Sequence, residues 1–145
     1  TGAWHGRVGW YHHPLNLAKM QAAAEKLLGE RDFSAFRAAE CQAKSPVKIM
    51  HRADIRRFND LLVFDFEASA FLHHMVRNLV GSLVEVGQGK HPPEWIAELL
   101  ARGDRRLAAP TFAAAGLYLT TVRYLPHWGL PSSDGTLFLP CGLNL

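Results

Sequence analysis

Residues 47–68 read VKIMHRADIRRFNDLLVFDFEA and carry the clearest structural pattern in the chain. Over residues 47–56 apolar and polar side chains alternate, which is the period of a β-strand. Asn59 and Asp60 form a turn signal, and residues 61–68 then return as a second strand. The segment predicts a β-hairpin whose first strand has one apolar and one basic face. The apolar face comprises Val47, Ile49, Ala53 and Ile55, the other face Lys48, Met50, Arg52, Asp54 and Arg56, and the apolar side of the return strand Leu62, Phe64, Phe66 and Ala68.

Three helices are predicted around this hairpin. The first follows Asn16, a preferred N-cap residue. The second covers residues 70–86 and has the broadest apolar stripe in the chain. The third begins near Pro93, which suits the first position of a helix. The glycines expected to end these helices are Gly29, Gly87 and Gly103, and the stripe of the second helix consists of Leu72, Met75, Val76, Leu79, Val80 and Leu83.

Short strands are also expected at residues 7–11 and 117–124. The resulting order, β-α-β-β-α-α-β, predicts an α+β domain with a mainly antiparallel sheet and helices packed over it. We place this domain at residues 1–125. Residues 126–145 contain several Pro, Ser and Gly and are expected to form an irregular tail.

The composition is that of a globular domain. The chain has 145 residues, of which 48% are hydrophobic and 20% charged, and its net charge is +3. Such a balance permits an anionic partner without requiring one. Two cysteines are too few for a disulfide framework or a four-ligand zinc site. The two cysteines fit a reducing cytoplasm, which is the expected location. No apolar run approaches the ~20 residues of a membrane span. No signal peptide is recognisable, and the absence of an initial Met suggests a fragment.

Basic residues recur along the first strand of the hairpin and are opposed there only by Asp54. At a spacing of four residues they share one strand face, and such a row can follow a phosphate backbone. The alternative is the solvated outer face of a sheet. The row comprises Lys44, Lys48, Arg52 and Arg56, with Arg57 beside it.

Arg77 lies next to the apolar stripe of the second helix, between Val76 and Val80. An arginine this close to a core must find an anion or stay at its edge, because an unpaired buried charge is costly. Two hypotheses follow. Arg77 either forms a salt bridge within the domain or holds a catalytic carboxylate or a phosphate.

Two pairs of adjacent histidines, at residues 12–13 and 73–74, complete the candidates. Adjacent residues on a helix point about 100° apart, so neither pair forms a natural two-ligand site. A metal-dependent hydrolase built on these pairs is therefore disfavoured, and one of His73 or His74 is a candidate for ligand contact. No carboxylate has a distinctive setting; those considered are Asp60, Asp65, Glu67 and Asp104.

Five segments, in order, resemble one known family. Residues 71–83 read FLHHMVRNLVGSL and closely resemble the C-terminal half of the tRNA pseudouridine synthase A family. Residues 28–38, LGERDFSAFRA, and residues 41–46, CQAKSP, are similar to its preceding segments. Asp104-Arg105 and residues 116–119, GLYL, are similar to its last two. The resemblance spans roughly residues 15–125 and implies a pseudouridine synthase-like half domain.

The resemblance implies an isomerase that converts uridine to pseudouridine in the anticodon stem-loop of tRNA, without a metal or an organic cofactor. In this family an Asp attacks or stabilises the detached fragment and an Arg pairs with that Asp. Arg77 matches this Arg, and Leu117 matches the aliphatic residue that lines the pocket. The partners implied are tRNA and a second copy in a homodimer. The residues expected to contact RNA are Arg37, Gln42, Lys44, Lys48 and His74.

One departure from the family pattern limits what this chain can do. The family nucleophile lies in an Arg-Thr-Asp-Ala-Gly-Val-His motif of the N-terminal half, and nothing like it occurs here. The chain is therefore expected to supply the Arg side of an active site and part of an RNA-binding cleft, and to be inactive alone. The alternative is an RNA-binding or dimerisation module with no catalytic role of its own.

Overall fold

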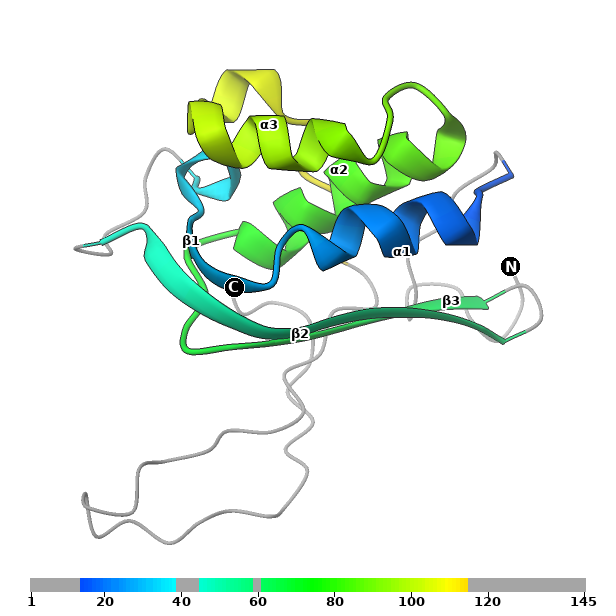
Figure 1. Ribbon diagram of the computed structural model, residues 1–145, viewed down its shortest axis with the longest axis horizontal. Helices are drawn as coiled ribbons and strands as arrows, with labels where there is room; N and C mark the ends of the chain where they lie inside the picture. The colour runs from blue at the N-terminus through cyan, green and yellow to red at the C-terminus, as the bar shows by residue number, and fades with distance from the viewer. Residues whose placement is uncertain (1–13, 39–44, 59–60, 115–145) are drawn as a thin grey trace, which may run out of the picture. The chain divides into compact units, whose positions relative to one another are not determined.

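The computed structural model describes residues 14–38, 45–58 and 61–114. Every helix and strand in these ranges belongs to one compact unit, Tyr11–Phe112. Within it, helices α1, α2 and α3 cover one face of a three-stranded sheet (Figure 1). The expected α+β architecture is confirmed. The elements are α1 (Leu17–Glu25), β1 (Gly29–Asp32), the 3-10 turn η2 (Ser34–Phe36), β2 (Val47–Phe58), β3 (Leu61–Ala68), α2 (Met75–Gln88), α3 (Glu94–Arg102) and the 3-10 turn η3 (Arg105–Leu107).

The sheet is antiparallel, in the order β1-β2-β3. β2 and β3 form the predicted hairpin, and Ile55 pairs with Phe64 on the face that the helices cover. β1 was not predicted. Its four residues, GERD, are all exposed and carry no apolar alternation, so the strand exists through its hydrogen bonding to β2 and not through burial.

A β-bulge changes the face pattern of β2. Met50 pairs with Ala68 and Arg52 with Glu67, so His51 is one extra residue in the ladder. An extra residue turns the side chains on one side of it to the opposite face. Met50 is consequently buried, at 2% exposure, while Ile49 is 42% exposed. The prediction of one apolar face along the whole strand was therefore wrong before the bulge and correct after it.

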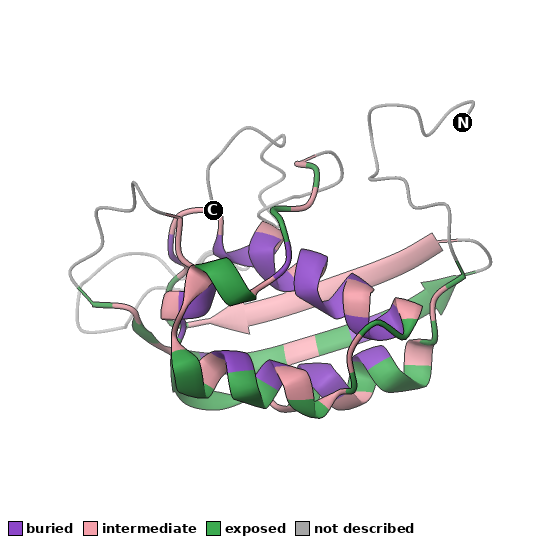
Figure 2. Cartoon of the chain, turned by 90° about the horizontal axis from the view of Figure 1, so that it is seen from above, coloured by how far each residue is buried: buried purple, intermediate pink, exposed green. Residues whose placement is uncertain are grey.

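α2 forms the centre of the core. None of its residues is exposed, and Figure 2 shows this helix without any of the green that marks exposure. The predicted stripe is buried except for Val80, which is half-buried. Both predicted ends were wrong. The helix begins only after His74, whose φ of 61° is left-handed, and it ends at Gly89, whose φ is 92°, so that Gly87 lies inside it.

The ends of α1 and α3 follow local rules. The side chain of Asn16 accepts a hydrogen bond from the backbone N–H of Lys19 at 3.1 Å, which confirms the predicted cap of α1. That helix ends at Glu25, whereas Gly29, with φ 93°, opens β1 and does not end the helix. α3 follows Pro93 and ends at Gly103, as predicted.

Several predictions concern residues outside the described ranges. They include the strands at residues 7–11 and 117–124, the turn at residues 59–60 and the tail at residues 126–145. Among the described residues, no helix has the length and apolar character needed to cross a bilayer.

Candidate active site

The N-terminal half of α2 carries Arg77 beneath a backbone segment, residues 109–112, which we call the strap. The Nε of Arg77 donates a hydrogen bond to the carbonyl oxygen of Phe112 at 2.8 Å. In return, the N–H of Phe112 donates to the carbonyl oxygen of Arg77 at 3.2 Å. This close crossing needs a glycine one turn further along, because a Cβ on Gly81 would lie 2.5 Å from the carbonyl oxygen of Pro110. The strap and α2 thus fix the inner end of the guanidinium.

The outer part of the Arg77 guanidinium has no acidic partner within the described ranges. The side chain is half-buried, and its one hydrogen bond there is to a neutral carbonyl. A partly buried cation without a counter-charge is a natural site for an anion. The geometry fits a carboxylate or phosphate that comes from outside these ranges, and it does not show the internal salt bridge that was the alternative.

Asn78, the next residue of α2, is a buried polar hub. It is 1% exposed, and its Nδ2 donates to the carbonyl oxygen of Phe36 at 2.8 Å. Its Oδ1 accepts from Arg105 Nη2 at 3.0 Å and from Thr111 Oγ1 at 2.7 Å. One side chain therefore connects α2 to the residues at the end of η2, to η3 and to the strap.

Arg105 holds the strap from the other side. Its Nη1 donates to the carbonyl oxygen of Ala109 at 2.9 Å, and its Nη2 reaches Thr111 Oγ1 at 3.2 Å. Burial lowers the pKa of the Arg105 guanidinium, because desolvation disfavours its charged form. An arginine nevertheless stays charged at neutral pH, so the strap is held by a cation whose partners are all neutral within the described ranges.

Two of the residues expected to contact RNA lie beside the start of α2. His73 and His74 stack with ring centroids 4.0 Å apart. The N–H of Ala38 donates to the carbonyl oxygen of His73 at 3.1 Å, which brings the half-buried Arg37 alongside them. A left-handed non-glycine residue such as His74 is uncommon and often marks a functional position. Arg37, His74 and Arg77 thus lie at the same end of one helix.

The basic row of β2 is not continuous. Because of the bulge, Lys48 lies on the other face of the sheet from Arg52 and Arg56. It pairs with Arg31 of the neighbouring strand β1. Arg57 turns toward the helices and donates to the carbonyl oxygen of Leu15 at 3.0 Å. The prediction of a single row of cations on one strand face was therefore wrong.

Arg52 is also surrounded by acids. Its nitrogens lie 3.1 Å from Asp65, 3.8 Å from Asp54 and 4.0 Å from Glu67. The expectation that only Asp54 opposes the basic residues missed the two carboxylates that the hairpin brings across from β3. The outer face of the hairpin has mixed charge, as the alternative interpretation of a solvated sheet face expects.

Three of the predicted site residues, Gln42, Lys44 and Leu117, lie outside the described ranges, as does Asp60. Asp104 is described and caps η3, accepting from the N–H of Arg106 at 2.9 Å and from its guanidinium at 3.0 and 3.1 Å. These hydrogen bonds lower the pKa of the Asp104 carboxyl. Across residues 14–38, 45–58 and 61–114, no cluster of three His, Cys, Asp or Glu side chains is arranged to hold a metal ion.

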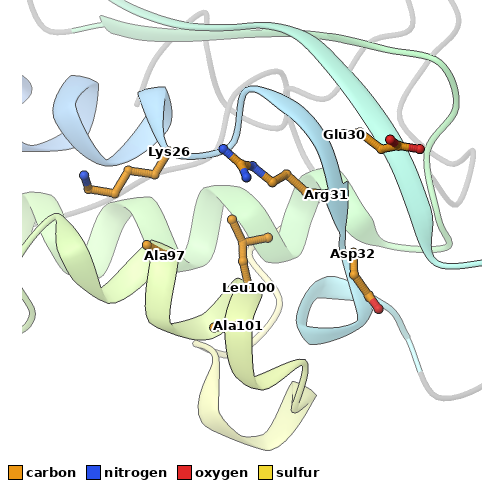
Figure 3. Close-up of a pocket in the computed structure, with 7 residues that line it drawn as sticks. All are labelled: Lys26, Glu30, Arg31, Asp32, Ala97, Leu100 and Ala101. Carbon is orange, nitrogen blue, oxygen red and sulfur yellow. The ribbon is translucent and has the colours of Figure 1, made fainter.

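A separate open groove of ≈ 530 Å³ lies between α3 and β1 (Figure 3). Lys26, Arg31 and Leu100 line it, together with the acids Glu30 and Asp32. Arg31 is partly engaged, since its Nε donates to the carbonyl oxygen of Leu28 at 3.1 Å. The groove contains none of the predicted site residues, and its charges are mixed.

Sequence reasoning missed the polar network in which the buried Asn78 and Ser82 bind Arg105 and the strap. A signal was present, because Asn78 and Ser82 are polar residues interspersed with the apolar stripe of this helix, and buried polar side chains need partners. Those partners lie 27 to 42 residues away along the chain. Their identity could only come from the tertiary structure.

Comparison with known proteins identifies relatives of this chain. The profile of a family described as tRNA pseudouridine synthase matches residues 23–125, well over half of the chain. The chain is 65% identical over 133 residues to "tRNA pseudouridine synthase A" of Dechloromonas aromatica, an alignment covering 92% of this chain and 51% of the relative. Proteins of the same name from Thiobacillus denitrificans (61% over 129 residues; 89% and 50% covered) and Bordetella petrii (53% over 133 residues; 92% and 50% covered) are also similar.

The chain spans about half the length of the curated relatives it matches. The profile match includes every described residue of α2, of the strap and of the two 3-10 turns. The resemblance inferred from the five sequence segments is thereby confirmed, and the chain belongs to the tRNA pseudouridine synthase family.

Proposed function

We propose that this chain supplies the Arg-bearing side of the active site of a tRNA pseudouridine synthase, which isomerises uridine to pseudouridine in the anticodon stem-loop. One observation carries the proposal. Arg77 is half-buried, fixed at its Nε by a neutral carbonyl and without an acidic partner in the described part of the chain. Membership of the family supports the same assignment.

The proposed role of Arg77 is electrostatic. A guanidinium beside a carboxylate keeps that acid ionised and oriented at neutral pH. Because the Nε already binds Phe112, the two η nitrogens form a fork of fixed direction for a catalytic Asp. That Asp would come from polypeptide outside this sequence, since the family motif that contains it is absent here.

The same proposal assigns RNA contacts and a pocket wall. A uridine must leave the base stack to be reached, which costs a few kcal/mol, and cationic contacts to the backbone offset that cost. Arg37 and His74 lie beside the start of α2, and this position supports the proposed RNA contacts. The full proposed set is Arg77 and Leu117 for the catalytic pocket and Arg37, Gln42, Lys44, Lys48 and His74 for RNA. We also infer a cytoplasmic enzyme that works as a homodimer without a metal or organic cofactor.

Tritium release tests the proposed activity. Pseudouridine forms when the N1–C1′ bond breaks and a C5–C1′ bond forms, so the hydrogen on C5 of uridine is lost to water. The chain alone should release no tritium from tRNA labelled at C5 of uridine. The chain fused to the half of the Dechloromonas aromatica relative that it does not cover should release it. Release by the chain alone would contradict the proposed division of the active site.

Arg77→Ala in this fusion separates catalysis from binding. We expect the rate to fall by at least about a hundredfold, because an electrostatic contact in the active site is lost. The affinity for tRNA should stay within about threefold, the effect of one phosphate contact or less. Arg102→Ala is the matched control, since it removes a cation whose side chain is 61% exposed and pairs with Glu98. Loss of affinity with an unchanged rate would support an RNA-binding module instead.

A further inference from the structure

We infer that Asn78 and Arg105 are positioning residues that orient the guanidinium of Arg77 through the strap. The inference rests on the proposed function, because it gives these two residues a role only if Arg77 is catalytic. It gives a function to the polar network that is centred on the buried Asn78 and that includes the cation of Arg105.

The first step is the chemistry of Asn78. Its position requires a neutral side chain that donates on one side and accepts on the other. The donor faces the carbonyl oxygen of Phe36, and the acceptor faces Arg105 and Thr111. An Asp would place a carboxylate oxygen against that carbonyl, and an Ala would remove the hydrogen bonds to Phe36, Arg105 and Thr111. Of the common side chains of this size, only Asn satisfies all of them.

The second step is the attachment of the strap. Arg105 binds it at Ala109 and at Thr111, and Ser82 accepts a hydrogen bond from the N–H of Ala109 at 3.3 Å. Thr111 is held in turn by Asn78. The next residue, Phe112, carries the carbonyl oxygen that binds Arg77 Nε. The carbonyl oxygen of Phe112 that orients the guanidinium therefore directly follows a segment held by the side chains of Asn78, Ser82 and Arg105.

The third step is what this attachment does for Arg77. An arginine side chain has several rotatable bonds, and a bidentate contact with a carboxylate demands one orientation. Misplacement by about 1 Å can cost about a hundredfold in rate. Asn78 and Arg105 touch neither the proposed carboxylate nor the uridine in this scheme, so they act only through Phe112 and Arg77.

A spectroscopic test uses the 145-residue chain itself. The hydrogen bond to Phe112 should slow exchange of the Arg77 Nε–H with water, measured by NMR at mildly acidic pH. Asn78→Ala and Thr111→Val should each accelerate this exchange by about five- to tenfold, the equivalent of one net hydrogen bond. Thr111→Ser keeps the hydroxyl and should restore slow exchange. Thr111 is exposed, so Thr111→Val keeps the test valid if Asn78→Ala fails to fold.

Gln21→Ala is the matched control. Its side-chain amide donates to the carbonyl oxygen of Ile55 at 2.9 Å, the same kind of bond as that of Asn78 but between α1 and β2. It should lower stability without changing the exchange of Arg77 Nε–H. Equal acceleration in Gln21→Ala and Thr111→Val would overturn the inference, because the effect would then reflect general loosening.

A kinetic test in the fused enzyme completes the experiment. Thr111→Val should lower kcat by about tenfold with KM for tRNA unchanged, and Thr111→Ser should recover it. If Arg77→Ala abolishes activity but Thr111→Val changes neither kcat nor Nε–H exchange, the positioning role is refuted and the proposed function stands. If Arg77→Ala leaves activity intact, the proposed function fails first.

Discussion

Gly81→Ala tests the close crossing of the strap over α2. Helix propensity alone predicts a gain, because Ala is better than Gly inside a helix by about 1 kcal/mol. The structure predicts the opposite. The new Cβ would lie 2.5 Å from the carbonyl oxygen of Pro110 and 3.6 Å from the backbone nitrogen of Phe112. These are backbone atoms, so the strap itself would have to move away from the helix.

The size of the expected destabilisation depends on the contacts that this movement of the strap would disrupt. Overpacking in a core costs about 1–3 kcal/mol. Lifting the strap also strains two hydrogen bonds between Arg77 and Phe112, each worth about 1 kcal/mol net. After subtracting the gain in helix propensity, we expect Gly81→Ala to lower the free energy of unfolding by about 1–3 kcal/mol. It should also accelerate exchange of the Arg77 Nε–H.

Urea unfolding measures the first effect and NMR the second. Gly87→Ala is the control, since it also replaces a buried glycine of α2 but meets the flexible side chain of Met20, whose Cγ would lie 2.6 Å away. It can lower stability, but it should leave the Arg77 Nε–H unchanged. A Gly81→Ala chain that is more stable than the original by about 1 kcal/mol would refute the reasoning, because helix propensity would then account for the whole effect.

Three further outcomes are expected. Asn16→Ala should lower the free energy of unfolding by about 1 kcal/mol in urea, because α1 loses its N-cap; an unchanged midpoint would contradict the cap. Leu79→Ala opens a fully buried site in α2 and should cost about 2–5 kcal/mol by the same measurement; a loss below about 1 kcal/mol would argue against this packing. The pKa of Asp104 is below its ordinary value of 3.8 because of the hydrogen bonds from Arg106. Its contribution to stability is therefore complete above about pH 4 and is lost as the pH falls through the folded-state pKa. Thermal unfolding should show that Asp104→Asn is less stable than the original chain at neutral pH and that this difference in stability disappears in acid. A difference that grows in acid would contradict the lowered pKa of Asp104.

The hairpin and the helices could be predicted because their apolar spacing is local. β1 could not, since four exposed residues with no alternation form a strand only when β2 lies beside them. The start of α2 was placed too early because residues 70–72 continue the apolar pattern, while nothing in the local sequence indicates the left-handed backbone of His74. Nothing in the alternation around His51 announces a bulge, so Lys48 was assigned to the wrong face.

In the candidate site, too, some features could be predicted from the sequence and others could not. Arg77 could be singled out from sequence, because a cation beside an apolar stripe needs an explanation. Its partner Phe112 lies 35 residues further along the chain, and no periodicity connects the two. Arg105 was noted only as part of a resembling segment, and its anchoring role depends on how η3 returns to α2.

The bulge at His51 has a consequence for how this hairpin tolerates changes in length. Removing His51 alone would restore a regular ladder with Met50 still paired with Ala68, so Ile49 and Met50 would keep their present sides of the sheet. Related chains can therefore lack this one residue without exchanging the buried and the exposed side chains of the hairpin.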